Sequence, residues 1–230
     1  MRVVQLLPML AFGDAIGNDV RGLKAALGEA GYDTEIYARV IDDRLPGGTA
    51  KPIEELRGLK DDDVVIYHLS TGDELNRKIL CLTGEKVILY HNITPPHFFK
   101  SYSRVHYMAC RQGLIETKEL AKTTDYAIAD SEYNRQDLLN FGYTCPIDVL
   151  PILIPFEDYQ KKPDARILRK YGDGYTNILF VGRIVPNKKQ EDVIASFYYY
   201  KEYINPKSRL ILIGTNAGMD GYRNALEEYV

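Results

Sequence analysis

The sequence predicts an α/β protein made of a complete Rossmann-like domain, a doubly wound parallel sheet, followed by the first part of a second. Two observations lead to this prediction. Apolar segments rich in Val, Ile, Leu and Tyr recur at fairly even intervals and alternate with segments of helical periodicity, as expected when helices connect parallel strands. These segments have too few polar residues for one face to be exposed to solvent. Such uniformly apolar strands are typical of a parallel sheet covered on both sides.

The first domain is expected over residues 1–155. Its strands are predicted at Val3–Leu10, Thr34–Ala38, Val64–Leu69, Lys86–His91, Tyr126–Ala129 and Asp148–Ile152. The intervening helices are predicted around Val20–Leu27 and at Asp73–Leu82, Val105–Lys122 and Glu132–Phe141. A glycine follows the first and the last of these helices, Gly31 and Gly142, and glycine is the usual residue just past a helix end.

A polar segment at residues 156–176 is predicted to be a linker, because it contains Pro163 and ends in Gly172-Asp173-Gly174. The alternation then restarts over residues 177–230. Strands are predicted at Asn177–Gly182 and Arg209–Gly214, and helices at Gln190–Tyr203 and Met219–Tyr229. Because two strands and two helices hardly close a core, we expect the chain to be truncated within this second domain.

Composition excludes several classes of protein. The formal net charge of the 230 residues is -3, whereas nucleic-acid-binding proteins usually have a basic face. The three cysteines are far apart in sequence, with no zinc spacing, which favours a reducing, cytoplasmic compartment. No apolar run approaches the ~20 residues of a membrane-spanning helix. Peripheral contact with the inner face of a membrane stays open, and the oligomeric state is undetermined.

In open α/β sheets, ligands bind at the carboxyl ends of the strands, so the residues that follow each predicted strand are the candidate site residues. They are Gly13, Asp14, Gly17 and Asn18 after the first strand, His68 and His91 at the ends of the third and fourth strands, and Asp130 and Ser131 after the fifth. His68 receives no role. Ser131 is predicted to cap the helix that follows it.

The segment after the first strand of the second domain is unusually basic. Asn187 is predicted to cap the next helix with Gln190 in a capping box, which would place Lys188 and Lys189 in its first turn, close to Arg183. The helix dipole disfavours cations there, whereas a bound phosphate would favour all three. The alternative is a basic surface loop that binds nothing.

This segment, GRIVPNKKQEDVIASF, resembles the G-R-x-x-P-x-K-G-x-x-x-x-I-x-A-F stretch of family 4 (group 1) glycosyltransferases, which have the two-domain GT-B fold. Earlier segments resemble other motifs of that family in the same order. They are DAIGNDVRGLKAAL with the following AGYDTEIYA, YHNITPP, and YAIADSEYNRQDLLNFG. The resemblance covers the whole chain. It implies a GT-B-like α/β fold and a retaining, metal-independent enzyme that has no cofactor.

By resemblance, the donor is a nucleoside-diphosphate sugar and the acceptor is a hydroxyl of a glycan or a lipid-linked molecule, as in surface polysaccharide synthesis. The residues implied are Arg183 and Lys188 at the donor diphosphate, Gly13 and Gly17 in the phosphate-approach loop, His91 as the catalytic residue near the transferred sugar, and Asp14, Asn18 and Arg111 as acceptor-side candidates. Lys189 replaces the family's glycine. The family's paired glutamates would lie beyond Val230, so this chain alone is expected to be inactive.

Other interpretations stay open or are disfavoured. A non-catalytic nucleotide-sugar or carbohydrate-binding module is the main alternative. An NAD-dependent oxidoreductase is disfavoured, because the first loop lacks G-x-G-x-x-G and the second strand is expected to end at Ala38-Arg39 without an acid. The D-x-D at Asp61–Asp63 is predicted to be a solvated acidic turn. The aromatic and basic segment His97–Arg111 is either ordinary helix packing or an acceptor or membrane-surface face.

Overall fold

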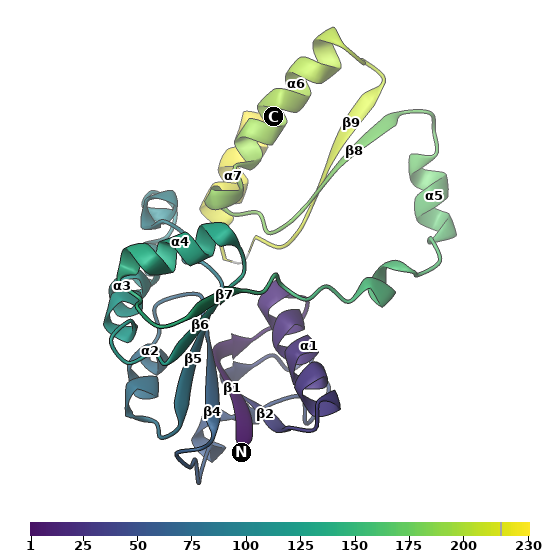
Figure 1. The fold of residues 1–230 in the computed structure, drawn as a ribbon. Coiled ribbons are helices and arrows are strands. Elements are labelled where there is room, and N and C mark those ends of the chain that lie inside the picture. Colours follow the sequence, from purple (N-terminus) through teal and green to yellow (C-terminus); the bar gives the residue numbers. More distant parts are fainter. Residues whose placement is uncertain (217) are drawn as a thin grey trace. The chain divides into compact units, whose positions relative to one another are not determined.

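The computed structural model describes residues 1–216 and 218–230. The chain forms two compact units (Figure 1). The first consists of residues 1–95 and 108–159, and the second of residues 96–107 and 160–230.

The first unit contains a seven-stranded, entirely parallel sheet, which confirms the predicted fold class. Its strands, in the spatial order β3-β2-β1-β4-β5-β6-β7, are β1 (Arg2–Leu10), β2 (Asp33–Ile41), β3 (Lys51–Pro52), β4 (Val64–Leu69), β5 (Glu85–Tyr90), β6 (Tyr126–Ala129) and β7 (Ile147–Val149). The order reverses between β1 and β4, and this topological switch point is where doubly wound sheets bind ligands.

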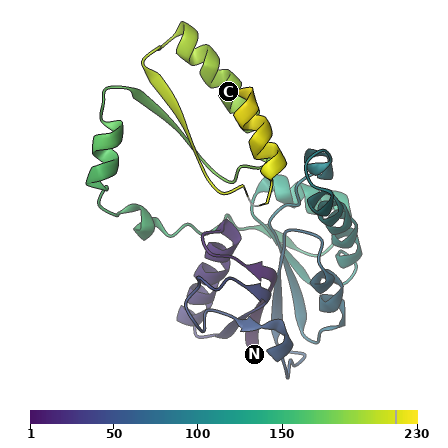
Figure 2. The same ribbon diagram turned by 180° about the vertical axis from the view of Figure 1, so that it is seen from behind.

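Four α-helices accompany this sheet, namely α1 (Ala15–Glu29), α2 (Glu74–Lys78), α3 (Arg104–Leu120) and α4 (Glu132–Phe141). Short 3-10 helices of this unit are η1 (Ile53–Glu55), η2 (Ile79–Cys81) and η4 (Phe156–Tyr159), whereas η3 (Pro96–Phe99) belongs to the second unit. Helix α1 lies on one face of the sheet, and α2 to α4 lie on the other (Figures 1 and 2). This arrangement follows from right-handed crossovers that run in opposite directions from the switch point.

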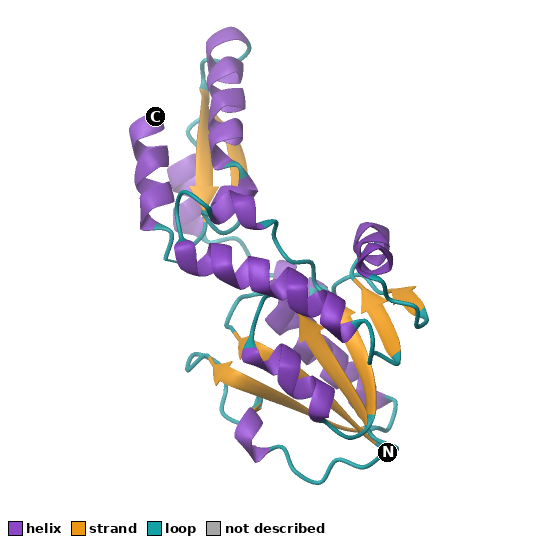
Figure 3. Ribbon diagram, turned by 90° about the vertical axis from the view of Figure 1, so that its left-hand side faces the viewer, coloured by secondary structure: helices purple, strands orange, loops and turns teal. Residues whose placement is uncertain are grey.

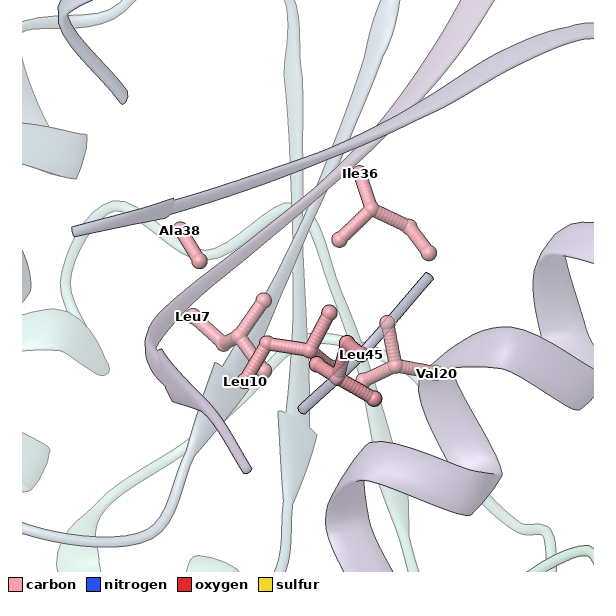
Figure 4. Packing of buried hydrophobic residues seen from close by; sticks show 6 residues of the cluster. All are labelled: Leu7, Leu10, Val20, Ile36, Ala38 and Leu45. Carbon is pink, nitrogen blue, oxygen red and sulfur yellow. The ribbon is translucent and has the colours of Figure 1, made fainter. Parts of the chain in front are cut away.

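The core of the first unit lies between the sheet and its helices. Strand β1 is buried at seven of its nine positions, as expected for a central strand with both faces covered. One apolar cluster joins β1, α1, β2 and the loop after β2 (Figure 4). It consists of Leu7, Leu10, Val20, Ile36, Ala38 and Leu45. This packing fixes the start of α1 relative to the end of β1.

The second unit contains two parallel strands, β8 (Thr176–Val181) and β9 (Ser208–Ile213). Its helices are α5 (Ala165–Tyr171), η5 (Pro186–Lys188), α6 (Gln190–Tyr203) and α7 (Asp220–Tyr229). Figure 3 shows the two strands as parallel arrows, with α6 and α7 beside them. Several large apolar side chains of these strands are exposed, among them Leu179, Val181 and Ile213.

Candidate functional site

A chain of hydrogen-bonded polar side chains crosses four neighbouring strands of the first sheet. Gln5 Oε1 of β1 accepts a hydrogen bond of 2.9 Å from His68 Nε2 of β4. His68 Nδ1 lies 2.8 Å from His91 Nε2, and His91 Nδ1 lies 2.9 Å from Asp130 Oδ2. His91 and Asp130 directly follow β5 and β6. Strand order therefore brings together residues that are far apart in sequence.

These side chains are almost completely buried. Gln5 and His68 are 0 % exposed as residues, and the side chains of His91 and Asp130 are 1 % and 11 % exposed. Burial, together with the charge of His91, holds the pKa of His68 well below its ordinary value. The prediction that His91 is catalytic is untested, but both of its ring nitrogens already have hydrogen-bond partners. A contact between substrate and either nitrogen would require one of these bonds to open.

Asp19 of α1 lies against the same cluster. Asp19 is only 3 % exposed. Its carboxylate accepts a hydrogen bond of 2.8 Å from the backbone N–H of Leu153, which follows β7. Burial raises the pKa of Asp19, while the Leu153 N–H and the charge of His91 oppose the rise. Asp19 thus ties the start of α1 to the segment that leaves the sheet, and its pKa stays above the ordinary value for an aspartate.

Replacing Asp19 by asparagine should stabilise the protein at neutral pH. Folded Asp19 binds its proton more tightly than the unfolded chain does, so wild-type stability falls as pH rises above the ordinary value of 3.8 through the raised folded pKa. Asparagine keeps an acceptor for Leu153 and removes this dependence. We expect the variant to gain about 0.5–3 kcal/mol at pH 7 and to lose its advantage near pH 3.5. Urea unfolding at the two pH values measures the gain, and an equal gain at both would contradict the assignment.

The loop after β1 has the form expected of an anion-binding helix start. Gly13 adopts the left-handed conformation. Helix α1 begins after Asp14, whose side chain makes no cap hydrogen bond, and its first turn contains no acidic residue. Such an uncapped N-terminus is suited to an anion. Packing also requires glycine at position 17, because a Cβ there would lie 2.7 Å from the carbonyl oxygen of Ala11.

The three acceptor-side candidates occupy different places. Asp14 precedes α1, and Asn18 within α1 accepts a hydrogen bond of 2.6 Å from Arg21. Arg111 lies exposed on α3. The structure does not test their roles, so these stay predictions.

The end of β2 corrects one expectation. The strand extends to Ile41, so that an acid, Asp42, does follow it. Its carboxylate accepts hydrogen bonds from the Arg44 side chain and from the Phe12 backbone N–H, and these partners, Arg44 foremost, lower its pKa. Because Arg44 already pairs with this carboxylate, Asp42 does not stand open to a ribose as the acid of a dinucleotide-binding domain would.

The D-x-D segment also differs in part from the expected solvated turn. Asp63 is buried and accepts hydrogen bonds from the backbone N–H groups of Arg2 and Lys60, which lower its pKa. It therefore fixes the start of β1. Within residues 1–216 and 218–230, the one group of His, Cys, Asp and Glu side chains with metal-ligand spacing is Asp19, His68 and His91, whose ligand atoms lie within 4.8 Å of one another.

In the second unit, the loop between β8 and α6 corrects the predicted helix start. Asn187 lies within the 3-10 turn η5 and is not the cap of α6. Lys189 precedes α6 in the left-handed conformation, with φ of 53°. The first turn of α6 carries Glu191 and Asp192, which match the helix dipole without any bound anion. The prediction that cations occupy the first turn of α6, where a bound phosphate would offset their repulsion by the helix dipole, is therefore wrong.

The same loop still presents two cations. Arg183 and Lys188 are exposed, and among the residues that the structure describes neither is paired with a carboxylate. Lys189, in contrast, lies 3.5 Å from Glu191. The loop is held in shape by Gln190, whose Nε2 donates to the carbonyl oxygen of Arg183 at 2.7 Å. A preorganised loop with two unpaired cations can bind an anion without a helix dipole.

Sequence reasoning named His91 and Asp130 as strand-end residues but missed the roles of Gln5, Asp19 and His68. One signal for Gln5 was present, since it is a lone polar residue inside the apolar strand RVVQLLPML. A buried polar side chain is informative because it needs a partner. Nothing local in the sequence indicated that this partner is His68.

The fold is that of GT-B glycosyltransferases. Among solved structures, the chain is similar to an α,α-trehalose-phosphate synthase (UDP-forming) from Burkholderia vietnamiensis, with a TM-score of 0.56 and 12 % identity over 99 % of this chain and 69 % of that chain. It is also similar to WaaG, a glycosyltransferase involved in lipopolysaccharide biosynthesis, with a TM-score of 0.58 and 13 % identity over 98 % of this chain and 67 % of that one.

Two other comparisons found nothing, since no protein-family model and no curated protein matches the chain. Identities this low establish the fold alone. Within the described part of the chain, no helix is both long enough and apolar enough to span a bilayer.

Proposed function

We propose that this protein is a retaining, metal-independent glycosyltransferase of family 4 type. It transfers a sugar from a nucleoside-diphosphate sugar to a hydroxyl of a glycan or lipid-linked acceptor, in the cytoplasm, and needs no cofactor. The observation that carries the proposal is that Arg183 and Lys188 are exposed on the loop after β8 and have no carboxylate partner among the described residues. The GT-B fold supports it.

The chemistry asked of this loop is stabilisation of a leaving group. As the bond to the anomeric carbon breaks, negative charge grows on the nucleoside diphosphate. Arg183 offers a planar set of N–H donors suited to phosphate oxygens, and Lys188 offers a point charge. Preorganised donors that meet developing charge are a large source of rate acceleration. In the first unit, the Gly13 loop and the uncapped start of α1 are, by themselves, a second candidate for binding a phosphate.

Transfer from a panel of radiolabelled nucleotide sugars to lipid-linked and free glycan acceptors tests this function. When residues 1–230 are joined to a segment with the paired glutamates, we expect one donor to support transfer, the product to keep the donor's anomeric configuration, and a chelator to leave the rate unchanged. Residues 1–230 alone should give no transfer. Saturable donor binding without turnover would instead support a non-catalytic module. Product of inverted configuration would contradict the retaining mechanism.

The exposed face of α3 is the reason to propose that this protein contacts an acidic membrane surface. Exposed residues recur there at helical spacing and combine apolar side chains with cations. They are Met108, Arg111, Ile115, Lys118 and, just past the helix end, Lys122. The neighbouring exposed acid, Glu119, is paired with Arg77 at 3.6 Å. Apolar and basic side chains on one stripe are typical of helices that lie on anionic bilayers.

Replacing Arg111, Lys118 and Lys122 together by glutamine should weaken binding to vesicles that contain anionic lipid by about 100-fold, at about 1 kcal/mol for each cation near the surface. Vesicle co-sedimentation measures the change. A matched variant with glutamine at the exposed cations Arg169, Lys170 and Lys201 should bind like the wild type. Equal weakening in both variants would show that net charge, not this stripe, drives binding.

A further inference from the structure

We propose that His68 and His91 are positioning residues, and that Asp130 is the residue of this cluster that accepts a hydrogen bond from a substrate hydroxyl. The assignment to a sugar or acceptor hydroxyl rests on the proposed function. The arrangement of protons behind it rests on the hydrogen-bond chain alone.

The protons in this chain can be placed in order. Gln5 Nε2 donates to the carbonyl oxygen of Val20 at 3.1 Å, so that Gln5 Oε1 faces His68. Oε1 can only accept, and His68 Nε2 must therefore carry the hydrogen. A neutral His68 then has a lone pair at Nδ1, so the 2.8 Å contact requires His91 Nε2 to donate. A third proton lies between His91 Nδ1 and Asp130 Oδ2, 2.9 Å apart.

The ring geometry favours a hydrogen bond over a metal ion at this place. The two imidazole planes are within 8° of each other, and their centroids are 5.1 Å apart. That separation is what two coplanar rings leave when an N–H···N bond of 2.8 Å runs in line between them. Two ligands on a tetrahedral zinc ion would hold their nitrogens about 3.3 Å apart, with the metal off the line that joins them. His68, His91 and Asp19 thus have the composition of a zinc site without its geometry.

Both ring nitrogens of each histidine already make a hydrogen bond in this arrangement. The free hydrogen-bonding capacity therefore lies at Asp130, the last residue of the hydrogen-bonded series. Asp130 Oδ1 is buried and has no hydrogen-bond partner among the residues that the structure describes. Buried acceptors normally have partners, and an unpartnered carboxylate oxygen is unfavourable. Asp130 directly follows β6, at the sheet edge where ligands bind. A hydroxyl that donates to Oδ1 would satisfy it, and His91 would hold the carboxylate in place.

Nitrogen-15 NMR of the histidine rings tests the proton arrangement without any substrate. We expect Nε2 of both histidines to be protonated and Nδ1 of His68 to be unprotonated. His68→Asn can place an amide oxygen where Nδ1 lies, and it should preserve the His91 signals. His68→Leu has no acceptor and should change them. An unprotonated His91 Nε2, identical signals in the two variants, or stoichiometric bound metal in the purified protein would overturn the arrangement.

The transfer assay tests the role of Asp130. Asp130→Asn retains an acceptor for His91 but places an amide donor in the position of Oδ1, so kcat/KM should fall about 10–100-fold, the contribution of one hydrogen bond to a charged group. His68→Leu should show part of this loss, and His68→Asn should recover activity. Wild-type kcat/KM in Asp130→Asn would overturn the assignment. If the protein that carries both this chain and the paired glutamates turns over no nucleotide sugar, the proposed function fails, while the NMR result still decides the proton arrangement.

Discussion

In a protein that carries the paired glutamates as well as this chain, Arg183→Ala and Lys188→Ala should each lower kcat for sugar transfer by about 10²–10³-fold, the loss seen when one preorganised donor to a developing anion is removed. The charge that these residues meet grows as the sugar–phosphate bond breaks. For this reason the loss should fall mainly on kcat, with a smaller change in KM. Steady-state kinetics over a range of donor concentrations separates the two.

Lys189 provides the matched control on the same loop. It is paired with Glu191 and stands where family 4 enzymes have glycine, and its left-handed backbone conformation favours glycine. Lys189→Gly should therefore keep kcat and should not destabilise the fold, since relief of about 1 kcal/mol of backbone strain offsets the lost side chain. If replacing Lys189 lowers kcat as much as replacing Lys188 does, the phosphate-binding lysine of this loop has been assigned to the wrong position.

Gly113→Ala should destabilise the first unit severely, by about 3–5 kcal/mol, because the backbone has no room for a side chain there. A Cβ at Gly113 would lie 2.5 Å from the backbone nitrogen of Gly72 and 2.8 Å from the carbonyl carbon of Thr71. This close approach packs α3 against the loop that follows β4 and His68. Denaturant unfolding of the variant measures the loss.

Gly28→Ala is the control for that substitution. Gly28 lies near the end of α1, and a Cβ there would meet no atom within 4 Å. Alanine should stabilise this helix by as much as about 1 kcal/mol, because it is the better helix former. Similar destabilisation by both alanine variants would contradict this explanation, because helix propensity favours alanine at both positions and a backbone clash is expected only at Gly113.

Local signals in the sequence predicted those elements that depend on local chemistry. Helix α4 has the predicted bounds, because Ser131 caps it by accepting from Asn134 N–H and Gly142 ends it in the left-handed conformation. The central strands were equally predictable from their apolar runs. The two-residue strand β3 was missed, since Lys51 and Pro52 form no apolar run and pair only with β2.

Predictions that depended on the end of an element were less secure. Asn187 and Gln190 have the spacing of a capping box, but Gln190 turns back to the carbonyl oxygen of Arg183, and its own backbone N–H donates to the Tyr222 hydroxyl. Contacts between α6 and α7 thus override the local signal. The chain of Gln5, His68, His91 and Asp130 depends on strand order, which no single segment encodes.

Calorimetric titration directly tests whether the loop after β8 binds the diphosphate of a nucleotide sugar. The titrants are nucleoside-diphosphate sugars of each base and the matching nucleoside monophosphates, all in the presence of a chelator. The account predicts saturable binding of one diphosphate sugar, much weaker binding of its monophosphate, and loss of binding in the Arg183→Ala, Lys188→Ala double variant. Equal binding by wild type and double variant, or no binding of any nucleotide sugar, would contradict it.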